Sequence, residues 1–230
     1  MSQIFSTNFV SHKILENLKS RGYDQFTLRP FNRHKPDNTI WWLVPSTEWP
    51  SYKHGKIAVF KSYNSEDFMV GLYFEKGLSA EASEMSSQKL RIQDDWAWNI
   101  FIKDIGNGNF EKILAAIFKS TGEDIKLILQ AIPVMDKEQA DKDFEIPEAI
   151  NTIEFKYNGI ELEYIKESAK GEMVSFKDIG KFEDLLKVFK ANDMEWYWID
   201  FYAVIEVTNS EWSKMESIVP IMINNYEEIF

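Results

Sequence analysis

Apolar residues recur every three or four positions between Phe9 and Arg21, which is the spacing of one face of an α-helix. Gly22 follows at once, where a residue with positive φ ends many helices. The pattern therefore predicts a helix over 9–21 with a glycine cap. The same reasoning predicts three more helices: Phe110–Lys119 closed by Gly122, Phe182–Lys190, and one from Ser210 onward that bends or restarts near Pro220.

Alternating apolar and polar residues, rich in aromatic and β-branched types, predict β-strands between these helices. The apolar run Ile125–Ile132 fits a strand or a buried helix equally well. The long segment Glu195–Val207 is apolar on both faces, which places it in the middle of a covered sheet. The predicted strands are Phe26–Phe31, Thr39–Val44, Ile57–Tyr63, Phe68–Phe74, Trp96–Ile105, Ile153–Tyr157, Ile160–Tyr164 and Glu195–Val207.

The dipeptide Asn158-Gly159 between two of these strands is a strong hairpin signal. A two-residue type I′ turn needs positive φ at both central positions, and Asn and Gly tolerate it best. That turn would place Phe155 opposite Leu162 and Tyr157 opposite Ile160. A second hairpin is expected to join 57–63 to 68–74.

Together these elements predict an α+β fold, with mainly antiparallel sheet and β-hairpins packed by helices. We divide the chain into two α+β halves, residues 1–122 and 123–230, with one continuous domain as the alternative. Each half contains a hairpin, a later Trp-x-Trp strand and a following helix, so an internal duplication is a further hypothesis.

The formal net charge of the chain is −11, from 26 Lys and Arg against 37 Asp and Glu. Such a charge disfavours nucleic acid and anionic membrane as partners and favours a basic protein. The absence of cysteine excludes disulfides, thiolate catalysis and zinc sites that need sulfur. We see no signal peptide and no apolar run long enough to span a bilayer, so a cytoplasmic protein is expected.

Aromatic residues are the most distinctive feature of the composition, with 34 in all and eight of them Trp. We expect most of these rings to be core, because each buries a large area. The alternative is an exposed platform able to grip a partner or line a small-molecule pocket. Asp200 is unusual within its apolar strand, since a buried carboxylate must pair, change its pKa or reach water. The platform residues are Trp96, Trp98, Trp196, Trp198, Asp200 and Tyr202.

Candidate catalytic residues are few. Asp136 precedes Glu154 and Lys156 by 18 and 20 positions, and two acids with a lysine occur in metal-dependent phosphodiesterases. Alternation alone, however, puts Glu154 and Lys156 on the solvent face of a strand. No phosphate-binding glycine loop, nucleophile motif or paired histidines are found, so we expect no cofactor and no bound metal.

The segment Asp136–Glu148 carries six acids against two lysines and is either a solvated loop or a docking arm. Its central acids are Asp141, Asp143 and Glu145. The expected function is binding of a basic protein, as an immunity, inhibitor or adaptor protein would do. A nuclease-like hydrolase and a small-molecule binder are the alternatives.

Overall fold

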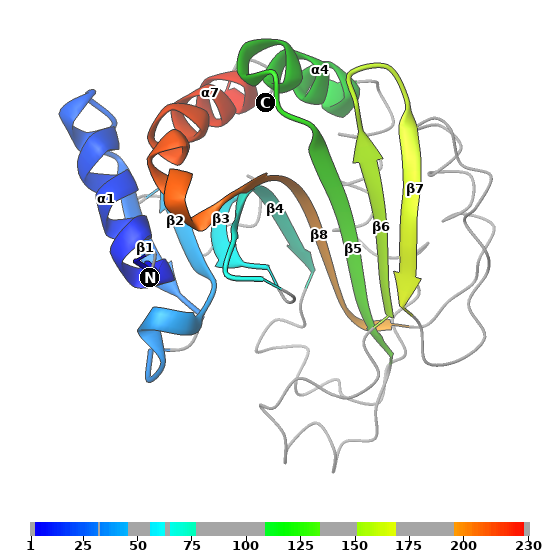
Figure 1. The fold of residues 1–230 in the computed structure, drawn as a ribbon, viewed down its shortest axis with the longest axis horizontal. Coiled ribbons are helices and arrows are strands. Elements are labelled where there is room, and N and C mark those ends of the chain that lie inside the picture. Colours follow the sequence, from blue (N-terminus) through cyan, green and yellow to red (C-terminus); the bar gives the residue numbers. More distant parts are fainter. Residues whose placement is uncertain are drawn as a thin grey trace. The chain divides into compact units, whose positions relative to one another are not determined.

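The computed structural model describes residues 3–31, 33–45, 56–62, 65–76, 109–133, 151–168 and 196–227 (Figure 1). These residues confirm an α+β fold with an antiparallel sheet of eight strands, in the order β1-β2-β3-β4-β8-β5-β6-β7. The strands are β1 (Phe26–Pro30), β2 (Trp41–Pro45), β3 (Lys56–Lys61), β4 (Phe68–Lys76), β5 (Ile125–Pro133), β6 (Asn151–Tyr157), β7 (Leu162–Ser168) and β8 (Trp196–Val207). The α-helices are α1 (Thr7–Ser20), α4 (Asn109–Thr121) and α7 (Met215–Glu227), and the 3₁₀ helices are η1 (Pro36–Asn38) and η3 (Asn209–Lys214).

The contacts divide the chain into two compact units. Unit 1 contains residues 1–74, 116–125 and 202–230, and unit 2 contains residues 75–115 and 126–201. The predicted halves 1–122 and 123–230, and their duplication, remain predictions. The expected strand Trp96–Ile105 and helix Phe182–Lys190 lie outside the described residues.

Helix α1 has the predicted glycine cap at its C-terminal end, and it also has an N-cap at its start. The Ser6 side chain accepts a hydrogen bond from the Phe9 amide at the first turn. At the other end, Gly22 has a φ of +92°, and the Tyr23 amide donates to the Leu18 oxygen. This is the Schellman arrangement, in which a left-handed residue lets the chain reverse onto the last helical turn.

The terminal helix does not restart at Pro220, which corrects that part of the prediction. The change from the 3₁₀ turn to the α-helix comes at Lys214 and Met215, and the non-helical φ/ψ inside η3 belongs to Glu211. Helix α7 continues through Pro220. Burial of its neighbours Val219 and Met222 accompanies this continuity, since packing of an apolar face contributes more to helix stability than local propensity does.

The strand prediction over Ile57–Tyr63 and Phe68–Phe74 is confirmed as the β3–β4 hairpin, with Lys61 opposite Phe68. The apolar run at 125–132 is the strand β5. The long last strand, β8, lies between β4 and β5 as its two apolar faces predict.

The hairpin at Asn158 forms, but its predicted register is wrong. Tyr157 pairs with Leu162 and Phe155 with Tyr164, so the connection has four residues instead of two. The Asn158 side chain explains the difference, because its oxygen accepts from the amides of residues 160 and 161, at 3.0 and 3.1 Å. No described non-glycine residue has positive φ, so Asn158 does not adopt the type I′ conformation.

A bulge interrupts the same hairpin further along. Glu154 pairs with Lys166 and Phe155 with Tyr164, which leaves Ile165 as the extra residue on β7. Ile165 is 40% exposed. β7 is the last strand in the sheet order, and a bulge at such a position disfavours pairing with strands of other molecules.

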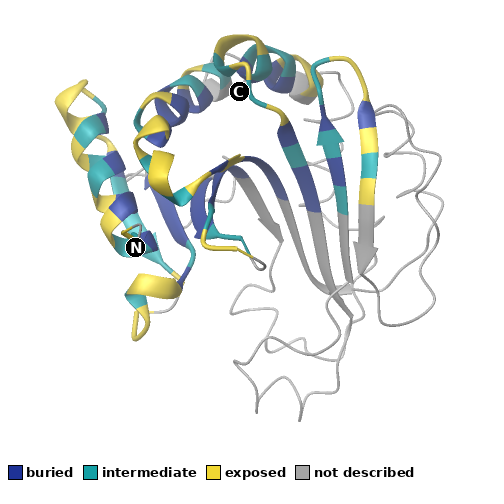
Figure 2. Ribbon diagram, viewed as in Figure 1, coloured by how far each residue is buried: buried dark blue, intermediate teal, exposed yellow. Residues whose placement is uncertain are grey.

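Within unit 1, helix α1 contacts β1, β2, β3 and α7. Its inner residues Val10, Ile14 and Leu18 are fully buried. Residues 41–44 of β2 and 202–205 of β8 are buried, whereas the outer side of α1 is exposed (Figure 2). No helix among the described residues is long and apolar enough to cross a lipid bilayer.

Gly71 on β4 is required by its close approach to β8. A Cβ atom at this position would meet the backbone oxygen of Ala203 and lie 2.5 Å from Val204 Cα. Backbone atoms in the middle of a sheet cannot move aside without disturbing the ladder, so only glycine fits.

We predict that Gly71→Ala lowers the free energy of unfolding by about 2 kcal/mol or more, because the added methyl group overpacks a backbone contact. The control is Gly122→Ala, where φ is +70° and a Cβ would meet nothing within 4 Å. Only backbone strain of roughly 1 kcal/mol is expected there. Urea unfolding measures both changes, and equal stabilities of the two variants would contradict the steric argument.

Candidate functional site

The described residues account for only part of the predicted aromatic platform. Tyr202 is 2% exposed and its ring centroid lies 5.2 Å from that of Phe60, inside unit 1. Three other platform residues, Trp196, Trp198 and Asp200, lie on β8, and nothing is described of their side chains. Trp96 and Trp98 lie outside the described residues. The platform therefore remains a prediction.

The hydrolase constellation is likewise described only in part. Glu154 and Lys156 are half-buried on one face of β6, with Phe155 and Tyr157 buried on the other. In the register, each lies opposite a residue of opposite charge on β7, namely Lys166 for Glu154 and Glu163 for Lys156. The remaining predicted residues, Asp136 and the docking acids Asp141, Asp143 and Glu145, lie outside the described residues. Among the residues that the structure does describe, no three His, Asp or Glu side chains gather as a metal site would need.

A cluster of three aromatic rings on unit 1 is the clearest candidate for a functional surface. Phe5 stacks on Phe9 with ring centroids 5.4 Å apart. Trp212 completes the cluster, at 5.7 Å from Phe5 and 5.5 Å from Phe9. These separations are typical of favourable aromatic pairs. The rings come from the N-terminal segment, the first turn of α1 and η3, so the fold unites residues about 200 positions apart.

This cluster is only partly covered. Phe9 is 41% exposed, and Ile4, next to Phe5 in the chain, is 63% exposed. Phe5 and Trp212 are half-buried. We call these four residues, Ile4, Phe5, Phe9 and Trp212, the aromatic surface. Contiguous apolar groups exposed together are characteristic of interaction sites, whereas single exposed apolar residues are ordinary.

Sequence patterns alone do not single out this surface, although two signals point to it. Phe9 lies one position before Val10, so it falls outside the buried stripe of α1. Trp212 stands among polar residues, with Glu211 before it and Ser213 and Lys214 after it. An aromatic residue that has no place on a core-facing stripe is a candidate for contact with another molecule.

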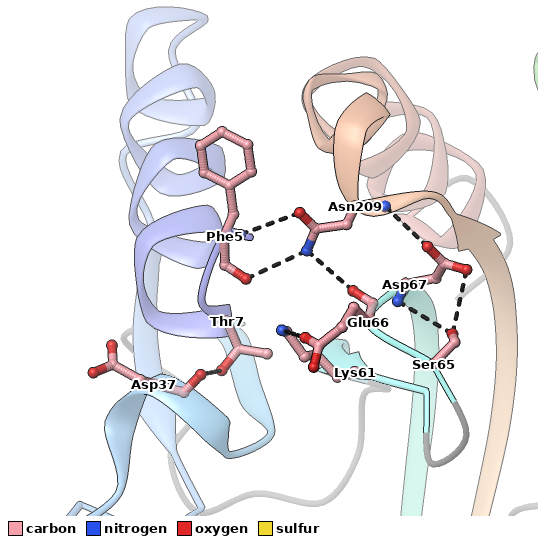
Figure 3. Close-up of polar contacts among 8 residues, drawn as sticks. All are labelled: Phe5, Thr7, Asp37, Lys61, Ser65, Glu66, Asp67 and Asn209. Atoms are coloured by element: carbon pink, nitrogen blue, oxygen red, sulfur yellow. Dashed lines mark hydrogen bonds and ion pairs between the residues drawn. The ribbon is translucent and has the colours of Figure 1, made fainter. Parts of the chain in front are cut away.

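Asn209, the first residue of η3, connects this surface to the rest of unit 1 (Figure 3). Its side-chain oxygen accepts from the Phe5 amide at 3.1 Å, and its side-chain nitrogen donates to the Phe5 oxygen at 3.4 Å. The same nitrogen donates to the Glu66 oxygen at 3.0 Å. One amide group therefore joins the N-terminal segment to the β3–β4 turn.

The β3–β4 turn is itself held by local polar contacts, also drawn in Figure 3. Asp67 accepts a hydrogen bond from the Asn209 backbone amide at 3.1 Å, and its other carboxylate oxygen accepts from the Ser65 hydroxyl. Lys61 forms an ion pair with Glu66 across the turn. Asp67 thus places a negative charge at the start of η3, where free amides favour it.

Charged side chains on η3 flank Trp212. Glu211 accepts from the Thr208 hydroxyl at 2.9 Å and pairs with Lys214 at 3.0 Å. The hydrogen bond from Lys214 is the largest cause that lowers the pKa of Glu211 below its ordinary value, and the hydrogen bond from Thr208 is the next. The hydrogen bond between Lys214 and Glu211 also raises the pKa of Lys214. Both groups are therefore charged near neutral pH, and they hold the turn that carries Trp212.

Tyr157 in unit 2 is a second group with a changed pKa. Burial raises the pKa of its hydroxyl, and the Glu111 carboxylate raises it further. The residue is 3% exposed and stays neutral at physiological pH, so this change follows from core packing and does not create a nucleophile. The cluster of Phe5, Phe9 and Trp212 offers apolar and aromatic contact.

In comparisons with protein-family models, curated proteins and solved structures, nothing matches this chain.

We predict that the environment of Trp212 depends on pH through Glu211. Because the folded-state pKa of Glu211 is lowered, its contribution to stability is present above its unfolded pKa and is lost as the pH falls through the lowered value. NMR titration of the Trp212 indole should therefore show a transition on the acid side. Glu211→Gln should remove that transition. An unchanged titration in the variant would show that another group is responsible.

Proposed function

We propose that this chain acts by binding a protein partner through the aromatic surface, as an immunity, inhibitor or adaptor protein would do. The observation that carries the proposal is the exposure of Phe9 in ring contact with the half-buried Phe5 and Trp212, with the exposed Ile4 next to Phe5 in the chain. Tryptophan and other aromatic residues supply much of the binding energy of protein interfaces. Covering these rings on association is favourable, because it removes apolar area from water. Each ring is already restrained by its neighbours, so less side-chain entropy is lost when the partner binds.

The three rings of the aromatic surface form a group, which separates Phe9 from Phe31, the other exposed aromatic residue among those described in unit 1. Phe31 is 53% exposed, but its only described ring contact is with Trp42, which is 8% exposed. Phe9 instead contacts two rings that are themselves partly accessible. Among the described residues, a partner can therefore bury several neighbouring apolar side chains at the aromatic surface, whereas Phe31 has only a buried ring beside it.

The charge of the chain supports a basic partner. Unit 1 carries 11 Lys or Arg against 13 Asp or Glu, for a net charge of −2. Unit 2 carries 15 Lys or Arg against 24 Asp or Glu, for a net charge of −9. The two units together give the total of −11. We assign the two features different roles: unit 2 attracts the partner over a distance, and the aromatic surface of unit 1 provides short-range affinity.

We predict that Phe9→Ser and Trp212→Ser each weaken partner binding about tenfold or more, the loss typical of an interface residue that contributes strongly. The full chain and its variants would be immobilised and exposed to extract from the producing cells, and retained proteins quantified by mass spectrometry. A retained protein of basic pI, lost from both variants, is expected.

The matched control is Phe31→Ser, an equally drastic change at an exposed Phe of the same unit. It should leave retention unchanged, and circular dichroism should show all three variants folded. Retention that is the same for every variant would overturn the proposed surface.

A separate experiment compares retention of the partner in about 0.05 and 0.5 M salt. If the negative charge of the chain attracts a basic partner, retention should be weaker at the higher salt concentration. Reversal to Lys at Asp141, Asp143 and Glu145 tests the predicted acidic arm in the same assay.

A further inference from the structure

The Asn209 side chain makes three hydrogen bonds to backbone atoms far away in the sequence. Two of them go to the amide and the oxygen of Phe5, and the third goes to the oxygen of Glu66. A side-chain amide that pairs with both groups of one residue imitates a neighbouring strand, because it offers a donor and an acceptor side by side. This pairing does not depend on which side chain residue 5 carries.

The position of the Phe5 backbone decides whether the three rings form one surface. Phe5 contacts both Phe9 and Trp212, at 5.4 and 5.7 Å. Residues 3–6 have no regular secondary structure, so the ring depends on tertiary contacts for its place. Asn209 begins the same 3₁₀ turn that carries Trp212, three residues later. One short turn therefore supplies a ring of the cluster and the group that holds another.

The β3–β4 turn restrains Asn209 in its own position. The Asn209 backbone amide donates to Asp67, and its side-chain nitrogen donates to the Glu66 oxygen. With the backbone and the side chain both bonded to the same turn, the amide has little rotational freedom. Such prior ordering reduces the entropy lost when a partner binds.

We infer that Asn209 is a positioning residue for the aromatic surface: its amide holds the N-terminal segment where the Phe5 ring joins Phe9 and Trp212. This inference rests on the proposed function for its biological meaning, but not for its structural test. Asn209 does not need to touch the partner. It sets the surface that the partner meets.

The test compares Asn209→Ala with Asn225→Ala by hydrogen exchange and NMR of the full chain. Asn225 is a matched control, because its side-chain amide also donates to a backbone oxygen, that of Ile221, within the same unit. In Asn209→Ala the Phe5 amide should exchange at least about fivefold faster, since the bond it donates is lost. The ring resonances of Trp212 should shift as Phe5 moves away. Neither change is expected in Asn225→Ala.

Two further variants separate the hold on the backbone from the ring itself. Phe5→Leu keeps the backbone bonds to Asn209, so its residue 5 amide should stay protected while the Trp212 resonances shift. Asn209→Asp keeps an acceptor for the Phe5 amide and loses both donated bonds. The exchange rate of the Phe5 amide in this variant should therefore lie between the rates in Asn209→Ala and in the native chain. An unchanged Phe5 exchange rate and unchanged Trp212 resonances in both Asn209 variants would overturn the inference.

The partner assay distinguishes this inference from the proposed function. If both hold, Asn209→Ala weakens retention of the same protein that Phe9→Ser loses, while Val10 and Ile14 amides keep their native protection. If Phe9→Ser and Trp212→Ser lose nothing, the proposed function fails, and the exchange result still decides the positioning role.

Discussion

Burial of the inner face of α1 is the interaction on which unit 1 depends. Val10, Ile14 and Leu18 are fully buried, and the helix contacts β1, β2, β3 and α7. Each such side chain contributes about 1.5–3 kcal/mol when it leaves water. This packing brings the N-terminal part of unit 1 onto its C-terminal part. The contacts between residues 5 and 209 could not form without it.

The same helix creates the exposed aromatic surface. Successive residues of an α-helix lie about 100° apart, so a stripe through Val10 and Ile14 directs Phe9 away from it. Phe9 therefore cannot join the core that its neighbour occupies. Ring contacts with Phe5 and Trp212 cover it in part and leave it 41% exposed. An apolar group that the fold leaves in water is available to another molecule.

Polar contacts near the aromatic surface join segments that are distant in the sequence, whereas the core beneath it is apolar. Thr7, at the start of α1, lies where the polar contacts meet the apolar core. It is 1% exposed, and its hydroxyl donates to the backbone oxygen of Asp37 (Figure 3). Asn209 and Asp67 serve the same purpose at the start of η3. These bonds satisfy backbone groups at the ends of helices and turns, and they set the direction in which each segment leaves the core.

Local patterns along the chain were sufficient for the fold class, for α1 and its glycine cap, for the β3–β4 hairpin and for the central position of β8. Each depends on periodicity or on the φ preference of single residues, which are encoded within a few positions. The register at Asn158, the continuity of α7 through Pro220 and the need for glycine at position 71 were decided by tertiary structure. In each case a side-chain bond, a packed face or a neighbouring backbone outweighed the local preference. The aromatic surface belongs to the second group, because Phe9 and Trp212 lie some 200 positions apart in the chain and meet only in the tertiary structure.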